Sequence, residues 1–260
     1  MNLFTCIRVY PGISKNPVLT GSKLETFSRC FHSFVKGLNA FNHCEILVLL
    51  DNCPKEFYNF LEEVSREFDG FNLTFRASAL TGNRGTFLEQ LSIALVREED
   101  FIFILEDDYL FIDNWSQDFL NFVKTNEDEF CFYTGYRTAD YKTLGFHQVL
   151  RRQFGKYGEA TTTLSFITKP YVLQKTYRAF LTFTKGNFDN VLWLYITDRF
   201  GYLRVFWYFI LDRRSVNLIR FLKFFWFYTH VTTFKLNVPE KSFMVHLEEA
   251  GFPEDMKVLL

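Results

Sequence analysis

Residues 101–105 (FIFIL) form an uninterrupted apolar run that ends in three consecutive acids, Glu106, Asp107 and Asp108. Such a run predicts a strand buried on both faces, as in a parallel sheet covered by helices. Three adjacent carboxylates repel one another, and a divalent cation held by one or two of them together with substrate phosphates would balance their charge. In an open α/β sheet, ligands bind at the carboxyl ends of the strands, which is where these acids lie. The alternative is an exposed acidic turn without a ligand.

Strand-like and helix-like stretches alternate along residues 1–135. Ser22 and Glu25 fit a capping box at the start of an apolar stripe with helical spacing. The expected strands are residues 3–10, 45–50, 73–77, 101–105 and 129–134, and the expected helices are residues 22–38, 54–68, 86–96 and 115–124. This alternation predicts an α/β fold with a Rossmann-like, mostly parallel central sheet flanked by helices. We expect one domain over residues 1–260, with an aromatic-rich, helical C-terminal part.

The charge and the cysteines exclude some classes of protein. A net charge of −1, from 29 Lys and Arg against 30 Asp and Glu, gives no support for a nucleic-acid partner. The 5 cysteines are scattered without a C-x-x-C pair, so they outline neither a disulfide framework nor a zinc site. The first residues lack the apolar stretch of a secretory signal, and no segment has the roughly 18 apolar residues of a transmembrane helix. We therefore expect a cytoplasmic protein.

Residues 199–228 interleave basic and aromatic residues and contain a single acid. This composition is typical of a surface that lies in a membrane interface. A helical lid packed over an active site would have the same composition. The segment is therefore expected to form either a lid or a peripheral contact with the inner face of a membrane.

Residues 105–110 (LEDDYL) resemble the Glu-Asp-Asp form of the DXD motif in nucleotide-sugar glycosyltransferases of the GT-A fold, in the style of the Golgi N-acetylglucosaminyltransferases. The resemblance implies that Asp108 binds Mn²⁺ or Mg²⁺, while Glu106 and Asp107 contact the ribose and base of a nucleoside-diphosphate sugar, with UDP-sugars favoured. It is useful over about residues 3–135, which would bind the donor, and loose over residues 136–260, which would bind a glycan or lipid-linked acceptor.

Three further positions are candidates for donor binding. Asp51 ends an apolar strand and is expected to accept hydrogen bonds from a ribose or a base; the alternative is a cap for the helix that begins near residue 54. Residues 83–85 (NRG) open the helix before the acidic strand, so Asn83 and Arg84 would lie at a helix N-terminus suited to a diphosphate. Arg8, at the end of the first strand, completes this set.

The residues expected to act on the acceptor lie later in the chain. Asp189 is the candidate base that would take the proton of the acceptor hydroxyl in an inverting transfer, and Asp198 is its rival. The alternative is that Asp189 caps a helix and that Asp198 pairs with Arg199 or its neighbours. Residues 158–168 would form the acceptor side of the sugar pocket, by the same resemblance, or a threonine-rich edge strand.

His246 ends a segment, residues 242–246 (SFMVH), similar to the late Ser-x-x-x-His element with which many GT-A enzymes complete the metal or diphosphate site. Imidazole is a good ligand, and His246 is expected to join Asp108 at the metal. The alternative is a histidine satisfied within the core.

Two other functions are compatible with a nucleotide site of this kind. A nucleotidyltransferase that makes sugar nucleotides would carry a glycine-rich loop after the first strand, and residues 8–12 (RVYPG) are a poor version of it. A catalytically silent protein that only binds nucleotide sugars would retain the same donor residues.

Overall fold

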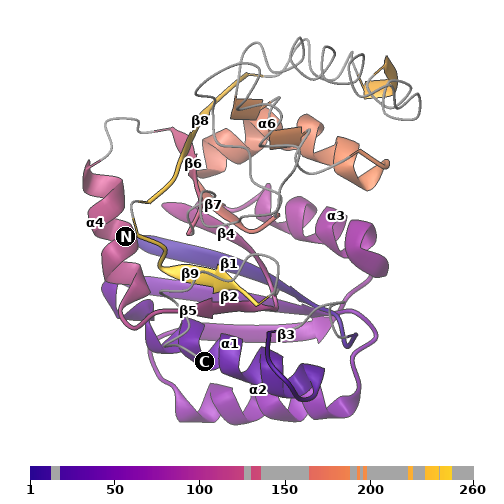
Figure 1. The fold of residues 1–260 in the computed structure, drawn as a ribbon, viewed down its shortest axis with the longest axis vertical. Coiled ribbons are helices and arrows are strands. Elements are labelled where there is room, and N and C mark those ends of the chain that lie inside the picture. The colour runs from indigo at the N-terminus through magenta and orange to yellow at the C-terminus, as the bar shows by residue number, and fades with distance from the viewer. Residues whose placement is uncertain are drawn as a thin grey trace.

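A computed structural model describes residues 1–12, 18–125, 130–135, 164–187, 192–193, 196–197, 222–224, 232–239 and 241–247. Its centre is a seven-stranded sheet with the order β3-β2-β1-β4-β7-β6-β8 (Figure 1). The strands are β1 (Asn2–Val9), β2 (His43–Leu50), β3 (Asn72–Ala77), β4 (Phe101–Glu106), β6 (Cys131–Tyr133), β7 (Phe166–Thr168) and β8 (Lys235–Asn237).

The sheet is mostly parallel, as predicted. Strand β1 pairs in parallel with β2 and with β4, β2 pairs in parallel with β3, and β6 does so with β8. Strand β7 is antiparallel to both of its neighbours, β4 and β6. Because β7 lies between two strands, residues 166–168 do not form an edge strand, and residues 158–163 of the predicted threonine-rich stretch lie outside the described residues. The strand order reverses between β1 and β4, which places a crevice outside the carboxyl ends of these two strands.

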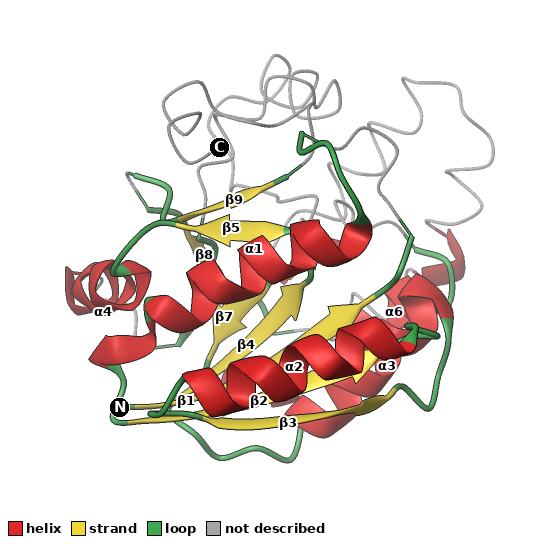
Figure 2. Cartoon of the chain, turned by 90° about the horizontal axis from the view of Figure 1, so that it is seen from below, coloured by secondary structure: helices red, strands yellow, loops and turns green. Residues whose placement is uncertain are grey.

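Helices cover both faces of the sheet. On one face lie α1 (Lys23–Lys36), α2 (Lys55–Glu67) and α4 (Trp115–Thr125), and on the other lie α3 (Gly82–Ala94) and α6 (Pro170–Thr184) (Figure 2). The capping box is confirmed, since the Ser22 hydroxyl accepts from Glu25 N and the Glu25 carboxylate accepts from Ser22 N. A short 3₁₀ helix (Leu38–Ala40) follows α1.

Alternate residues of β1 belong to the two cores, as the period of a strand requires. Leu3 and Ile7 pack with the helices α1, α2 and α4, whereas Phe4 and Cys6 pack with α3 and α6. Much of the phenylalanine content fills these two layers as ring pairs. The rings of Phe166 on β7 and Phe180 on α6 stack 4.9 Å apart. Burial of such side chains is the main favourable contribution to folding.

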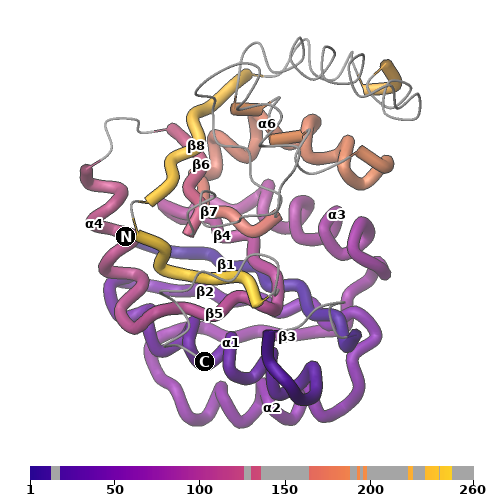
Figure 3. Tube along the Cα trace, viewed as in Figure 1, coloured from indigo at the N-terminus to yellow at the C-terminus, as the bar shows by residue number. Residues whose placement is uncertain are grey.

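A second, two-stranded sheet brings a late segment of the chain to the acidic turn. Strand β5 (Tyr109–Phe111) directly follows the acids, and it pairs in antiparallel fashion with β9 (Met244–His246). Figure 3 shows the late segment crossing back to lie beside β5. In this register Tyr109 is opposite His246. The sequence contained no signal for this pairing.

Of residues 199–228, only Leu222–Phe224 belong to the described part, and they are helical. The lid and the membrane contact therefore stay predictions. No helix within the described ranges is long and apolar enough to cross a membrane.

A buried hydroxyl in β1 offers a test of this packing. Thr5 is fully buried, and its Oγ1 has no hydrogen-bond partner among the described residues. A buried polar group without a partner is costly, so Thr5→Val should raise the free energy of unfolding by about 1 kcal/mol. The matched variant is Thr168→Val, because the equally buried Thr168 Oγ1 donates to Cys131 O at 2.9 Å, and it should lower stability by about 1 kcal/mol. Urea denaturation of both variants measures the change in the free energy of unfolding. A loss of stability in both would contradict the conclusion that Thr5 Oγ1 lacks a hydrogen-bond partner in the described part of the chain.

Candidate functional site

A cleft of about 420 Å³ opens at the carboxyl ends of β1, β2 and β4 and at the first turn of α3. It occupies the point where the strand order reverses. The residues that line it are Arg8, Val9, Tyr10, Gly12, Lys23, Asp51, Gly82, Asn83, Thr86, Glu106, Asp107 and Asp108. The predicted strand and its acids therefore lie at the edge of a cleft large enough for a small molecule.

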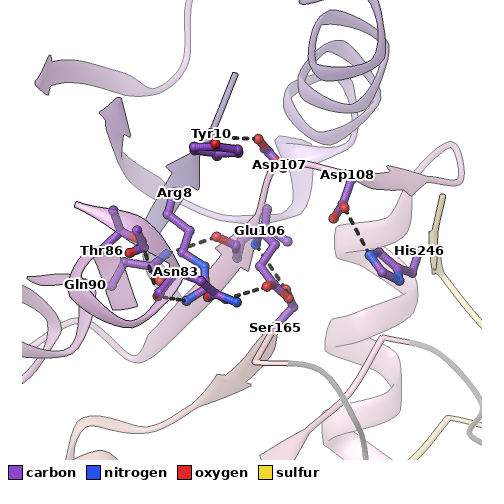
Figure 4. A network of polar contacts seen from close by, with 12 residues as sticks. Arg8, Tyr10, Asn83, Thr86, Gln90, Glu106, Asp107, Asp108, Ser165 and His246 are labelled. Atoms are coloured by element: carbon purple, nitrogen blue, oxygen red, sulfur yellow. Dashed lines mark hydrogen bonds and ion pairs between the residues drawn. The ribbon is translucent and has the colours of Figure 1, made fainter. Parts of the chain in front are cut away.

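Glu106, the first acid, is held by a cation from the neighbouring strand. Arg8 and Glu106 are opposite each other in the β1–β4 register, and the guanidinium Nη2 forms an ion pair with Glu106 Oε1 (Figure 4). On the other side, Ser165 Oγ accepts from Glu106 N at 3.0 Å and donates to Glu106 Oε2 at 3.3 Å. The guanidinium also lies over the ring of Phe87, 5.1 Å from its centre. These contacts place the Glu106 carboxylate between β1 and the start of β7.

Asp107, the second acid, has both carboxylate oxygens engaged by the protein. Its Oδ1 accepts from Lys23 Nζ at 2.8 Å, and its Oδ2 accepts from the Tyr10 backbone N–H at 3.0 Å. Burial raises the pKa of Asp107 to about 6, against the opposing effect of Lys23. Although burial alone would lower it, the pKa of Lys23 is raised by the charges of Asp107 and Asp108.

Asp108, the third acid, lies opposite a histidine. Asp108 Oδ2 is 3.1 Å from His246 Nε2, and the His246 ring stacks on Tyr109 with the ring centres 4.9 Å apart. The Leu247 backbone N–H donates to Asp108 O at 2.9 Å, so β9 is attached directly to the acidic turn. Burial acts to raise the pKa of Asp108, but His246 beside it lowers that pKa to about 2. Asp108 is therefore a carboxylate at neutral pH.

The donor set of Asp108 and His246 fits a divalent cation. Asp108 Oδ1 is buried and has no hydrogen-bond partner among the described residues. A carboxylate oxygen suits Mn²⁺ or Mg²⁺, and an imidazole nitrogen beside it can provide a second ligand. The described residues bring together no group of three or more His, Cys, Asp or Glu that could hold a metal. Mg²⁺ commonly completes its coordination with substrate phosphates and water.

Asp51 forms the far side of the cleft. It is 2% exposed, its Oδ2 accepts from Gly82 N at 2.6 Å, and its Oδ1 accepts from Asn52 Nδ2 at 2.8 Å. The alternative that Asp51 caps α2 is wrong, because the N-cap of that helix is Pro54 and has no side-chain hydrogen bond. Asp51 instead connects the end of β2 to the first residue of α3. Gly82 has φ of +73°, a conformation that favours glycine.

Asn83 and Arg84 differ in their position relative to the cleft. Asn83 lines it, and Asn83 O lies 3.4 Å from Arg8 Nη1. Arg84 is exposed and does not line the cleft. Its guanidinium lies near Gly186, where an added Cβ would be 3.7 Å from Arg84 Nη1. In the first turn of α3, Asn83 therefore faces the cleft, whereas Arg84 faces the end of α6.

Glu89 fixes the loop that leads into this turn. Its Oε2 accepts from Ser78 Oγ at 2.5 Å, from Ala79 N at 2.8 Å and from Leu80 N at 3.1 Å. Its Oε1 lies 2.7 Å from Arg76 Nη1. Although burial acts to raise it, these hydrogen bonds and the ion pair hold the pKa of Glu89 below its ordinary value.

Sequence reasoning did not identify Lys23, Tyr10 or Ser165 as parts of the site. One feature of the sequence could have indicated Lys23. A cation in the first turn of a helix opposes the helix dipole, so a lysine at that position indicates a compensating partner elsewhere. Ser165 lay within the predicted acceptor-side stretch, whereas its hydroxyl contacts Glu106 on the donor side. The predicted bases, Asp189 and Asp198, both lie outside the described residues.

Neither a family model nor a curated protein matches this sequence. The solved structures of similar fold include S. aureus TarS 1–349, with a TM-score of 0.50 and 11% identity over 94% of this chain, and S. aureus TarS, with a TM-score of 0.50 and 9% identity over the same share. This chain spans 60% of the length of TarS 1–349 and 36% of that of TarS. Glucosyl-3-phosphoglycerate synthase from Mycobacterium tuberculosis, in complex with Mn²⁺, UDP and glucosyl-3-phosphoglycerate, has a TM-score of 0.46 and 11% identity, over 77% of this chain and 66% of its own.

At these identities the likeness concerns the fold alone. The fold is that of the GT-A glycosyltransferases, with a mixed, mostly parallel central sheet flanked by helices. The predicted fold class is confirmed.

The loop held by Glu89 provides a test of how the cleft is built. Glu89→Gln removes the charge that accepts three hydrogen bonds and should lower the free energy of unfolding by about 1–3 kcal/mol at pH 7. The pKa of Glu89 is lower in the folded protein than its ordinary 4.5, so the carboxylate stabilises the folded state above that pH. This contribution is lost as the pH falls through the folded-state value.

The difference in the free energy of unfolding between native protein and Glu89→Gln should therefore be smaller at pH 4 than at pH 7. Urea denaturation at the two pH values measures it. The control is Glu62→Gln. Glu62 pairs with Arg66 on the exposed side of the same helix, so this substitution should have little effect on the free energy of unfolding. A constant difference at the two pH values would contradict the role of the charge.

Proposed function

We propose that this protein is a glycosyltransferase that binds a nucleoside-diphosphate sugar with a divalent cation and transfers the sugar to a hydroxyl group of a glycan or lipid-linked acceptor. One observation carries the proposal: the cleft at the reversal of strand order has at its edge the buried Asp108 Oδ1, which no described residue hydrogen-bonds, with His246 beside it. A diphosphate supplies the oxygen ligands that these two side chains leave open.

The donor would lie along the carboxyl ends of the strands, with its diphosphate at Asp108 and its nucleoside toward Asp51. Asp108 and His246 would hold Mn²⁺ or Mg²⁺. Asn83 would lie at the helix N-terminus near the diphosphate, where backbone N–H groups and the helix dipole favour an anion. UDP-sugars are the donors we expect first, by the resemblance of residues 105–110 to the DXD motif.

When bound, the cation would neutralise charge on the departing nucleoside diphosphate. The proton of the acceptor hydroxyl would pass to a carboxylate, for which Asp189 is the first candidate and Asp198 the second. Inversion at the anomeric carbon follows from a single displacement with such a base.

Asp108→Asn tests the cation site. In the native protein, a nucleoside diphosphate that binds only the folded state should raise the melting temperature, and it should do so only with Mn²⁺ present. Asp108→Asn should remove this Mn²⁺-dependent rise while the protein stays folded, because the variant lacks the charged ligand. A thermal-shift panel with UDP, GDP, dTDP, CDP and ADP, with and without Mn²⁺, measures the effect and identifies the base.

The control is Asp69→Asn, which changes an exposed aspartate in the turn between α2 and β3 and should behave as the native protein. No rise with any nucleotide in the native protein would contradict the proposal. A rise that Asp108→Asn retains would remove Asp108 from the cation site. Nucleotide binding without sugar transfer to any acceptor would indicate a protein that only binds nucleotide sugars.

Asp189→Asn tests the catalytic base. The variant should bind UDP and Mn²⁺ as the native protein does and should lose transfer by a factor of about 10²–10⁴, the usual contribution of a general base. Donor consumption in the presence of an acceptor provides the rate, and Asp198→Asn is the comparison. Full activity in Asp189→Asn with loss in Asp198→Asn would assign the base to Asp198, and full activity in both would favour a mechanism without either base.

A further inference from the structure

Lys23 occupies a position that is unfavourable for a lysine. It is the first residue of α1, where its charge opposes the helix dipole, and its side chain is only 9% exposed. The N-terminus of this helix is already capped by Ser22 and Glu25. The ammonium group of Lys23 therefore contributes nothing to capping, and its burial must be offset by a partner.

That partner, Asp107, is engaged entirely within the protein. The carboxylate is also only 9% exposed, and its second oxygen accepts from the Tyr10 backbone N–H. A carboxylate with both oxygens bound in this way connects the end of β1, the start of α1 and the end of β4. It is also the residue directly before Asp108.

A second connection joins the same segments from the other side. Val18 N donates to Leu247 O at 3.2 Å, and Leu247 N donates to Asp108 O at 2.9 Å. The segment that leads into α1 is therefore attached to the acidic turn through Lys23 and to the end of β9 through Val18. Asp108 and His246 lie between these two connections.

We propose that Lys23 is a positioning residue, whose ion pair with Asp107 fixes the acidic turn so that Asp108 and His246 meet the cation together. This inference rests on the proposed function. It also assigns Asp107 to this ion pair and away from the donor, in contrast to the role that the resemblance to the DXD motif implies for the middle acid.

The direction in which Mn²⁺ affinity changes when Lys23 is replaced distinguishes positioning from a simple effect of charge. Removal of a cation beside Asp107 and Asp108 makes the site more negative, which by Coulomb's law strengthens the binding of Mn²⁺. Loss of positioning weakens it, because a residue that orients a metal ligand contributes about 10- to 100-fold to affinity. A residue that only stabilises the fold leaves the affinity of the folded protein unchanged.

The experiment titrates Mn²⁺ into native protein and Lys23→Met in the presence of the nucleoside diphosphate that the native protein binds, and follows free Mn²⁺ by its electron paramagnetic resonance signal. Lys23→Met should bind Mn²⁺ about 10- to 100-fold more weakly, and Lys23→Arg, which keeps the charge and the donors, should recover most of the affinity. The matched control is Lys55→Met, which changes the first residue of α2, a lysine that is exposed.

A variant with an unpaired buried carboxylate can fail to fold. The double variant Lys23→Met/Asp107→Asn removes both charges and keeps a carbonyl that can accept from Tyr10 N. Its net charge is unchanged, so Coulomb's law predicts native affinity, whereas loss of positioning again predicts weaker binding. Native or tighter Mn²⁺ affinity in folded Lys23→Met, or in the folded double variant, would overturn the role of Lys23. Absence of Mn²⁺ binding in the native protein would instead overturn the proposed function, and this inference with it.

Discussion

The structure depends on how three adjacent carboxylates at the end of a buried strand are balanced. Each carboxylate is matched to a different basic side chain: Glu106 to Arg8, Asp107 to Lys23, and Asp108 to His246. Two of these partners are cations that are themselves buried, so each would be costly alone. Because the three partners come from β1, the start of α1 and β9, the acidic turn holds together segments from the beginning, the middle and the end of the chain. The ion pairs therefore reinforce, at the edge of the sheet, contacts between segments that also share one apolar core.

The topology of the sheet makes this balance possible. The strand order reverses between β1 and β4, so the end of β1 lies next to the end of β4 and Arg8 is opposite Glu106 in the register. The same reversal opens the cleft, because α1, which follows β1, and α3, which leads into β4, lie on opposite faces of the sheet. All three acids have a basic partner within the protein at the edge of this cleft, but Asp108 also has a buried oxygen that no described residue hydrogen-bonds. The triplet thus divides into acids that hold the turn and one that is open to a ligand.

The features that the sequence predicted are local, and those it did not predict depend on pairing between distant segments. The apolar run before Glu106, the capping box at Ser22 and the strand that ends at Asp51 are each visible in a few consecutive residues, and the structure confirms all three. The contact of Lys23 with Asp107 spans 84 residues, and no local pattern specifies it. The pairing of β5 with β9 joins residues that are still farther apart in the sequence, and three-residue strands are too short for a periodic signal. His246 could be proposed from resemblance, but its position opposite Asp108 follows only from that pairing.

The two ends of the cleft are held by contacts from different parts of the chain. On the side proposed for the nucleoside, Asp51 binds the first residue of α3, and Glu89 accepts three hydrogen bonds from the loop before it. These contacts join β2, β3 and α3 within the first half of the chain. On the side proposed for the cation, His246 lies in the three-residue strand β9 and contacts Asp108. The contacts around Asp51 therefore do not require the late segment of the chain, whereas the contact of His246 with Asp108 does. Binding of a cation between Asp108 and His246 would then stabilise the pairing of β9 with β5, and this linkage would couple metal affinity to the docking of the late segment.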